Sequence, residues 1–456
     1  MLSRLAARAT SLTEHYMPAP YLFALLLTFL TAALGVGVMR TPVDDLVGYW
    51  YGGLWEILTF TAQMVLVLLC GHALADAPAV KRVLNWISAL PRTEREAGVG
   101  VFLACWAAAL FNWGFCLVVA GVLSREIPKR LPGVSKAYLA AAGYAGFVVW
   151  GSGISSSVAL ATATPGSPMN AVELFAHQTL TLPDLLFTPF NLIPVLAMAV
   201  LMPALFWRIC PPSARGATVP ITSTRFDSGV AVDVVSLEVL EAAEAPGAPR
   251  TFADRIEQSW LITAVLAAMS LGYIGRLVQQ GRFHLDFNMM IFILLLLGWI
   301  LHGTPIRYMK AFHAGSQAAG PLLLAYPLYG GILGLIRDTG LADWFAQLFV
   351  AFSTERTLPF WSYVSANIIN MFIPSGGGQW AVQGPVMIKA AVGLNASLPK
   401  TAMGVAFGDQ VSNLLQPFWA LAVTGIGGAN LREMMGYCLL AMLIAFPLFG
   451  LALLLL

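Results

Sequence analysis

The sequence predicts an all-α polytopic membrane protein with inverted repeats, about nine full transmembrane helices, two re-entrant hairpins, and broken helices at the midplane. Three observations predict it. Of 456 residues, 58% are hydrophobic and 11% are charged, whereas a soluble domain carries about 25% charged residues. Apolar runs long enough to cross a bilayer recur along the chain. Short motifs of the first half also return in the second half at a nearly constant offset.

Uncharged runs mark the candidate spans, because about 20 apolar residues in a helix cross the hydrocarbon core. The segment before the first run, 1–18, holds Arg4 and Arg8 and lacks the apolar core of a signal peptide, so no cleavable signal is expected. The runs are Pro20–Met39, Ile57–Ala75, Ala137–Thr164, Leu185–Trp207, Ser259–Gly275, Phe287–His302, Ser316–Ile336, Thr401–Gly427 and Met434–Leu456.

Two further apolar stretches, 97–124 and 358–394, are interrupted in the middle. The first is broken at Asn112-Trp113-Gly114 and the second at 374–379, which reads Pro-Ser-Gly-Gly-Gly-Gln. Glycine costs about 1 kcal/mol in a helix interior and proline about 3 kcal/mol, and irregular backbone cannot face lipid. These stretches are therefore either kinked full spans or re-entrant hairpins.

The distribution of positive charge favours hairpins. With a cytoplasmic N-terminus and two hairpins, 18 Lys and Arg residues fall on the cytoplasmic side and 7 on the outside, as the positive-inside rule requires. The segments on either side of the first hairpin, 81–95 and 125–136, are both basic. If 97–124 crossed the membrane, one of these segments would lie outside.

An internal repeat divides the chain. Asn112-Trp113-Gly114 corresponds to Ser375-Gly376-Gly377, and further matches keep the offset between 261 and 263 residues. Inverted repeats whose broken helices meet near the midplane are typical of secondary transporters. The expected organisation is a first repeat 1–210 with hairpin 97–124 on the cytoplasmic side and broken span 137–164, a cytoplasmic linker 211–257, a connecting span 258–283, and a second repeat 284–456 with hairpin 358–394 and broken span 401–427.

Polar residues in four of these apolar segments are the candidate binding residues. Hairpin tips present helix N-termini, which attract anions, and hydroxyl and amide groups add donors. No lysine or arginine lies deep in a predicted span, which favours a small monoanion over a dicarboxylate or phosphate. The candidate substrate-binding residues are Asn112, Trp113, Gly114, Ser152, Ser155, Ser156, Ser375, Gly376, Gly377, Gln379, Gln383, Asn413 and Gln416.

Asp409 is the one acidic residue well inside a predicted span, and a charge there indicates function. With Ser412 and Asn413 it forms a candidate coupling site for Na⁺ or a proton. The alternative is a helix N-cap near the interface, because Asp409 follows Thr401 by eight residues.

Several other residues allow more than one interpretation. The serines at 155–157 fit helix packing as well as ligand contact. The tryptophans at 113, 150, 380 and 419 fit either interfacial anchors or the lining of an apolar pocket.

Other protein classes are disfavoured. The sequence contains no HExxH, GxSxG or Walker A motif, so an enzyme is not expected. The five cysteines are scattered in apolar runs without a CxxC pair, which indicates packing rather than metal binding or disulfides. The sequence has no basic stripe, so nucleic-acid binding is not expected. No cofactor is expected apart from a coupling Na⁺.

The motifs together resemble the bacterial short-chain fatty acid transporter family over essentially the whole chain. They are Asn112-Trp113-Gly114-Phe115, Ala163-Thr164-Pro165-Gly166, the run 374–380 followed by Gln383-Gly384-Pro385, Gln416-Pro417-Phe418-Trp419-Ala420-Leu421 and Met435-Gly436-Tyr437-Cys438. The family often carries Glu where this chain has Asp409, which leaves the coupling ion open.

The resemblance implies import of butyrate- or acetoacetate-like monocarboxylates across the bacterial inner membrane. It also implies a homodimer with elevator-type alternating access, by analogy with a broader ion-transporter superfamily. The alternatives are another small carboxylate or an amino acid as substrate, a passive channel, or a membrane enzyme.

Overall fold

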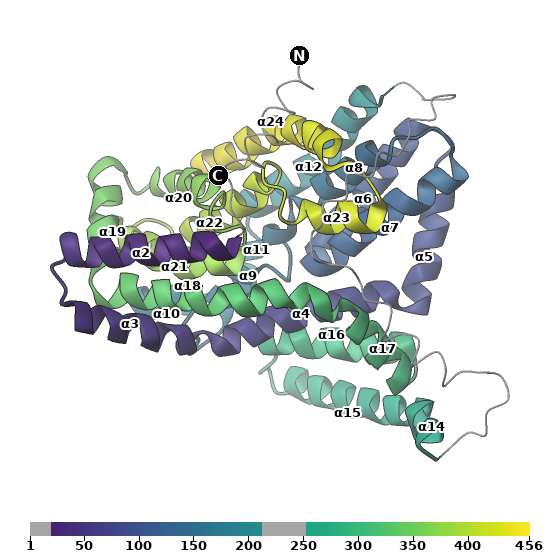
Figure 1. Ribbon diagram of the computed structural model, residues 1–456, viewed down its shortest axis with the longest axis horizontal. Helices are drawn as coiled ribbons and strands as arrows, with labels where there is room; N and C mark the ends of the chain where they lie inside the picture. Colours follow the sequence, from purple (N-terminus) through teal and green to yellow (C-terminus); the bar gives the residue numbers. More distant parts are fainter. Residues whose placement is uncertain (1–19, 212–251) are drawn as a thin grey trace.

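The computed structural model describes residues 20–211 and 252–456, and this part of the chain is helical without strands (Figure 1). The predicted cytoplasmic N-terminus and most of the predicted linker 211–257 lie outside the described residues. The helices of the first half are α2 Pro20–Gly37, α3 Val43–Glu56, α4 Leu58–Asp76, α5 Pro78–Ala89, α6 Glu94–Phe111, α7 Trp113–Arg130, α8 Lys136–Phe147, η1 Trp150–Ser152, α9 Ser157–Ala163, α10 Ala171–Ala176, α11 Leu182–Leu186 and α12 Pro189–Ile209.

The second half begins after two helices, α14 Phe252–Glu257 and α15 Trp260–Gln279. Its helices are α16 Phe287–His302, α17 Pro305–Gly315, η2 Ser316–Ala319, α18 Gly320–Asp338, α19 Leu341–Phe352, α20 Leu358–Ile369, α21 Gly376–Leu394, α22 Leu398–Ser412, α23 Ala420–Gly427 and α24 Leu431–Leu455.

One order of elements occurs in both halves. A span (α2, α16) is followed by a long interrupted helix (α3–α4, α17–α18), a short helix (α5, α19), a paired hairpin (α6–α7, α20–α21), an interrupted helix (α8–α9, α22–α23) and a last span (α12, α24). The helix α15 lies between the two sets. Opposite orientation of the halves in the membrane stays a prediction.

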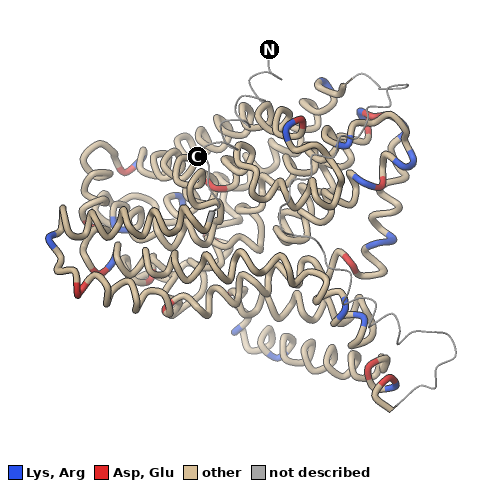
Figure 2. Tube along the Cα trace, viewed as in Figure 1, with Lys and Arg blue, Asp and Glu red and all other residues tan. Residues whose placement is uncertain are grey.

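Membrane-spanning helices are plentiful in the described part of the chain. Six helices there are long and apolar enough to cross a bilayer: Val43–Asp76, Lys136–Ala163, Pro189–Ile209, Trp260–Gln279, Pro305–Asp338 and Leu431–Leu455. Shorter apolar helices are Tyr21–Gly37, Phe287–His302 and Leu341–Phe352. Figure 2 shows charged residues mainly near helix ends and loops, with long uncharged stretches between them. The protein is thus a multi-pass membrane protein, and the count of nine full spans stays a prediction.

The second expected span, Ile57–Ala75, is only part of a longer element. The helix α3 precedes it, and the two are separated by a break at Ile57, where φ is −99° and ψ is 18°. The sequence analysis did not predict α3, because Asp44, Asp45 and Glu56 interrupt its apolar run. In the structure α3 packs along α18 of the other half (Figure 1).

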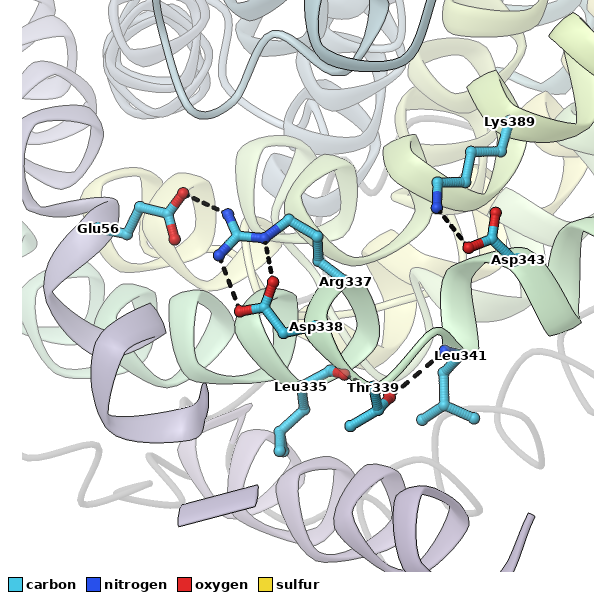
Figure 3. A network of polar contacts seen from close by, with 8 residues as sticks. All are labelled: Glu56, Leu335, Arg337, Asp338, Thr339, Leu341, Asp343 and Lys389. Atoms are coloured by element: carbon cyan, nitrogen blue, oxygen red, sulfur yellow. Dashed lines mark hydrogen bonds and ion pairs between the residues drawn. The ribbon is translucent and has the colours of Figure 1, made fainter. Parts of the chain in front are cut away.

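Ion pairs stand at the end of this α3–α18 pair (Figure 3). Arg337 on α18 donates from Nη1 to Glu56 Oε1 at 2.5 Å and from Nε to Asp338 Oδ1 at 2.7 Å. Lys389 on α21 donates to Asp343 Oδ2 on α19 at 2.7 Å. The Arg337–Glu56 pair joins the two halves, and the Lys389–Asp343 pair holds the second hairpin to α19.

Candidate functional site

The tip of the first hairpin consists of Asn112 alone between α6 and α7. Its side chain is fully buried and caps α7, because Oδ1 accepts from Phe115 N at 2.8 Å. Its Nδ2 donates to the Val67 carbonyl on α4 at 3.3 Å. The backbone N–H of Trp113 donates to Ser155 Oγ at 3.0 Å. The tip is therefore fixed between α4 and the break in the α8–α9 helix.

The tip of the second hairpin faces the same break. Ser375 caps α21 by accepting from Gly378 N at 3.4 Å, and its Oγ lies 2.7 Å from the Tyr326 hydroxyl. Gly376 approaches so closely that a Cβ atom there would lie 2.3 Å from Cη2 of Trp150. Only glycine allows this approach, which explains the glycine run.

A small cavity lies where the two tips meet. Its lining is mainly aromatic, with two serines and the two glycines of the second tip. The residues are Met64, Trp113, Phe147, Trp150, Ser157, Tyr326, Ser375, Gly376, Gly377 and Trp419. Its volume is about 20 Å³, and a cavity of about 10–15 Å³ already holds one water. A carboxylate of three or four carbons is larger, so its binding requires a wall of the cavity to move.

The cavity is rich in hydrogen-bond donors without partners. Nε1 of Trp113, Nε1 of Trp150 and Oγ of Ser157 are all buried and make no hydrogen bond. The helices α7 and α21 also have their N-termini at this cavity, since Trp113 and Gly376 are their first residues. Buried donors normally have acceptors, and helix N-termini favour negative charge. Since none of the lining residues is charged, the arrangement suits a small monoanion with an apolar tail between the rings.

Asp409 lies in the last part of α22 and is fully buried. The N-cap of α22 is Ser397, whose side chain accepts from Lys400 N, so Asp409 is not a helix cap. Its Oδ1 accepts from Asn413 Nδ2 at 3.2 Å. Asn413 Oδ1 in turn accepts from Gln416 Nε2 at 2.6 Å. This chain of amides points its donors toward the carboxylate.

Asn370, at the end of α20, joins the same cluster. Its Nδ2 lies 3.0 Å from the Asp409 carbonyl, 2.7 Å from Ser412 Oγ and 2.9 Å from Asn413 Oδ1. Three acceptors around Nδ2 fix the orientation of the amide, so Oδ1 points the other way.

Four buried side-chain oxygens on or beside α20, α21 and α22 accept no hydrogen bond. They are Asp409 Oδ2, Asn370 Oδ1, Asn367 Oδ1 and Gln379 Oε1. Asn367 lies in the last turn of α20 and Asn370 directly follows it, Gln379 of α21 donates to the Ala366 carbonyl of that turn, and the backbone carbonyl of Asp409 on α22 accepts from Asn370. Oxygens without donors are what a hard cation or a proton requires.

The predicted site residues fall into distinct groups. Trp113, Ser375, Gly376 and Gly377 line the cavity. Asn112, Gly114, Ser155 and Ser156 lie directly behind its wall, in caps and helix contacts. Asp409, Ser412, Asn413 and Gln416 form the polar cluster.

Three predicted residues make other contacts. Ser152 Oγ contacts the Gln410 side chain at 3.3 Å. Gln379 and Gln383 donate to carbonyl groups of α20 and so bind the two arms of the second hairpin together. They reach the candidate cluster only through the free Oε1 of Gln379.

Several residues of the site were not predicted as binding residues. Met64 and Tyr326 belong to long apolar helices, where nothing in the sequence marks them. Asn370 and Asn367 lie four and seven residues before Pro374, where the second tip begins, and these polar residues in an apolar helix could have been noticed. Trp380 does not line the cavity: its Nε1 donates to the Met169 carbonyl at 2.7 Å.

Two interrupted helices and two hairpin tips enclosing a small donor-lined cavity define a multi-pass membrane transporter. The model of the Short chain fatty acid transporter family matches residues 1–456. The chain belongs to this family, and it is therefore a transporter and not an enzyme.

Similar proteins agree with this assignment. A short-chain fatty acid transporter family protein of Haemophilus influenzae is 31% identical over 456 residues, and one of Escherichia coli K12 is 32% identical over 450, each covering 98% of both chains. Among solved structures, the YdaH transporter of Alcanivorax borkumensis has a TM-score of 0.54 at 16% identity, covering 96% of this chain and 98% of that one. MtrF of Neisseria gonorrhoeae has a TM-score of 0.55 at 15% identity, covering 98% and 97%. These two share the fold.

Proposed function

We propose that the protein is a secondary active transporter that imports short-chain monocarboxylates, such as butyrate or acetoacetate, across the bacterial inner membrane. The observation that carries the proposal is the set of three unpartnered donors, Trp113 Nε1, Trp150 Nε1 and Ser157 Oγ, around an uncharged aromatic cavity. The carboxylate would accept from these donors, and the alkyl chain would lie between the rings.

Charge selects among carboxylates in this arrangement. A hydrogen bond to a charged group contributes about 1.5–3 kcal/mol, so three donors compensate much of the desolvation of one carboxylate. A dicarboxylate would bring a second charge into a lining that has no cation. A buried unpaired charge is strongly unfavourable, which supports monocarboxylates as the substrate class.

We propose that uptake is coupled to a cation bound by Asp409, with Na⁺ favoured over a proton. A proton on Asp409 Oδ2 would satisfy that oxygen and one acceptor. The cluster has three further oxygens without donors, on Asn367, Asn370 and Gln379. A cation that takes several oxygen ligands would draw on oxygens of this kind. Asn413 would then donate to the carboxylate, and Ser412 would accept from Asn370, without binding the ion themselves.

The transport cycle that we propose is alternating access of the elevator type in a homodimer, with the N-terminus in the cytoplasm. The fold shared with two solved transporters supports a transport cycle. The small volume of the cavity supports the need for such a movement, because the site is closed around about one water.

Uptake of labelled butyrate into proteoliposomes tests the substrate class. Unlabelled short monocarboxylates are expected to compete, and succinate and phosphate are expected to compete at least tenfold less well. Competition by succinate equal to that of butyrate would overturn the proposal.

The Asn370→Ala variant tests the ion site. We expect a higher Na⁺ concentration for half-maximal uptake, because one oxygen and the support of Asp409 are lost. Asn395→Gly is the matched control, since Asn395 is exposed and left-handed (φ 52°) at the end of α21. A thermal melting curve in detergent separates loss of ion affinity from unfolding. Unchanged Na⁺ dependence in a folded Asn370→Ala protein would contradict the site.

A further inference from the structure

A second cavity, of about 480 Å³, lies between α4, α5, α7 and α17. It carries two ion pairs, Asp76 with Lys81 and Arg125 with Glu126. Its lining residues are His72, Ala75, Asp76, Lys81, Leu84, Asn85, Val118, Val122, Arg125, Glu126, Ala311, Ala314 and Gly315. A cavity of this size with charged walls holds water.

The same two helices line this cavity and the candidate substrate cavity. Along α4, Met64 lines the substrate cavity, and His72 and Asp76 line the larger one. Along α7, Trp113 lines the first and Val118 the second. The two cavities therefore lie one after the other along the seam between α4 and the first hairpin.

A short region of close packing between α4 and the tip of the first hairpin separates the two cavities. A Cβ atom on Gly71 of α4 would lie 2.3 Å from Asn112 Oδ1 and 2.7 Å from Phe115 N. A Cβ atom on Gly114 of α7 would lie 3.3 Å from Cα of Leu68. The residues of α4 in this contact, 67–71, form little more than one helical turn, which is about 5.4 Å.

The contact is also weakly bonded. One hydrogen bond across it runs from Asn112 Nδ2 to the Val67 carbonyl, at 3.3 Å. The rest is van der Waals contact between two glycines and their neighbours. A shift of the hairpin tip away from α4 would therefore connect the two cavities and break this one hydrogen bond to α4.

The corresponding place at the second hairpin is closed. There, α21 packs on α10 and α18, and the cavity between them has a volume of about 10 Å³. Gly378 packs on Tyr329 so tightly that a Cβ atom would lie 2.5 Å from its ring. The first hairpin thus has an open, charged space beside it, whereas the space between α21, α10 and α18 is nearly filled.

We propose that the 480 Å³ cavity is the vestibule through which substrate passes between the cytoplasm and the site, and that the contact of Gly71 and Gly114 with the first hairpin tip is its gate. The proposal rests on the proposed transport function. The cytoplasmic side follows from the basic segments 81–95 and 125–136, which supply Lys81 and Arg125 to the vestibule. The ion pairs keep the vestibule hydrated without a strong net charge, so an anion is neither trapped nor repelled.

Cysteine labelling tests the vestibule without requiring transport. In a Cys210→Ser parent, which removes the one half-buried native thiol, Val118→Cys is expected to react with a membrane-impermeant thiol reagent from the cytoplasmic face. Met64→Cys, behind the gate, is expected to react at least tenfold more slowly. Unreactive Val118→Cys, or labelling only from the opposite face, would overturn the vestibule.

A glycine substitution tests the gate. In the Met64→Cys background, Gly71→Ala is expected to raise the labelling rate several-fold, because its methyl group pushes the tip away from α4. Gly100→Ala is the control, since a Cβ atom on Gly100 meets nothing within 4 Å. If Gly71→Ala does not fold, the milder Gly114→Ala takes its place. Unchanged labelling in a folded gate variant would overturn the gate, and failure of butyrate uptake alone would overturn only the proposed substrate.

Discussion

A substitution at Trp150 can separate the effect of a hydrogen bond to the substrate from the effect of ring packing. Trp150→Phe removes the unpartnered Nε1–H and keeps an aromatic ring. Loss of a bond to a charged group costs about 1.5–3 kcal/mol, and each 1.4 kcal/mol is tenfold in affinity. We therefore expect the KM for butyrate to rise roughly 10- to 100-fold, measured by uptake at varied concentration.

Trp380→Phe is the matched control for this prediction. Its Nε1 already donates to the Met169 carbonyl, and it does not line the cavity. It is expected to lower the melting temperature and to leave the KM within a factor of about three. An equal rise in KM for both variants would show that Trp150 acts through packing.

Asp409 carries the prediction about coupling. Asp409→Asn keeps the size of the side chain but cannot neutralise a bound cation or exchange a proton. We expect uptake against the butyrate gradient to be lost, while movement of butyrate down its own gradient continues. Asp45→Asn, which changes an exposed carboxylate in the first turn of α3, is expected to behave as wild type. Full accumulation by Asp409→Asn would remove Asp409 from the coupling site.

The sequence predicted part of the site because the chemistry of its residues is exceptional for a membrane. Asp409 was recognisable as a charge in an apolar run, and the two tips as glycine and asparagine breaks. Tyr326 and Met64 could not be recognised, because their contact with the tips depends on how α4 and α18 pack. Gln383 was placed near the substrate, whereas its amide binds the two hairpin arms together.

At the scale of elements, the second hairpin tip depends on glycine at its closest contact. A Cβ atom on Gly376 would lie 2.3 Å from Trp150 and 2.8 Å from Ser157 Oγ. We expect Gly376→Ala to displace the tip and reduce butyrate uptake at least tenfold, in protein that still elutes as a folded species.

Gly393→Ala on the same helix provides the control. A Cβ atom there would make an ordinary contact, 3.5 Å from Val350. Alanine is also favoured over glycine in a helix by about 1 kcal/mol, so uptake and stability should be retained. Normal uptake by Gly376→Ala would mean that the tips do not enclose the site.

Several predicted boundaries coincide with the ends of helices. The arms of the second hairpin, α20 and α21, fill the predicted range 358–394, and α15 begins one residue after the predicted start at Ser259. The helix α3 was missed because two aspartates and three glycines conceal its amphipathic pattern. Its place is determined by packing on α18, which no local pattern reports.

At the scale of the whole molecule, nine full spans and a cytoplasmic N-terminus place the C-terminus outside. A phosphatase fused after Leu456 is then expected to be active and a fluorescent protein fused there to be dark. The same pair fused at the N-terminus should give the opposite result. A fluorescent C-terminal fusion would require an even number of spans and would contradict the predicted inverted arrangement of the halves.

Most centrally, we propose that the cavity between the two tips binds short monocarboxylates and that an ion gradient drives their transport. This proposal is tested most directly by labelled butyrate uptake into proteoliposomes under a Na⁺ gradient and a proton gradient, imposed separately. We expect accumulation above equilibrium with an inward Na⁺ gradient, and loss of that accumulation in Asp409→Asn. No uptake by folded protein under either gradient would contradict it.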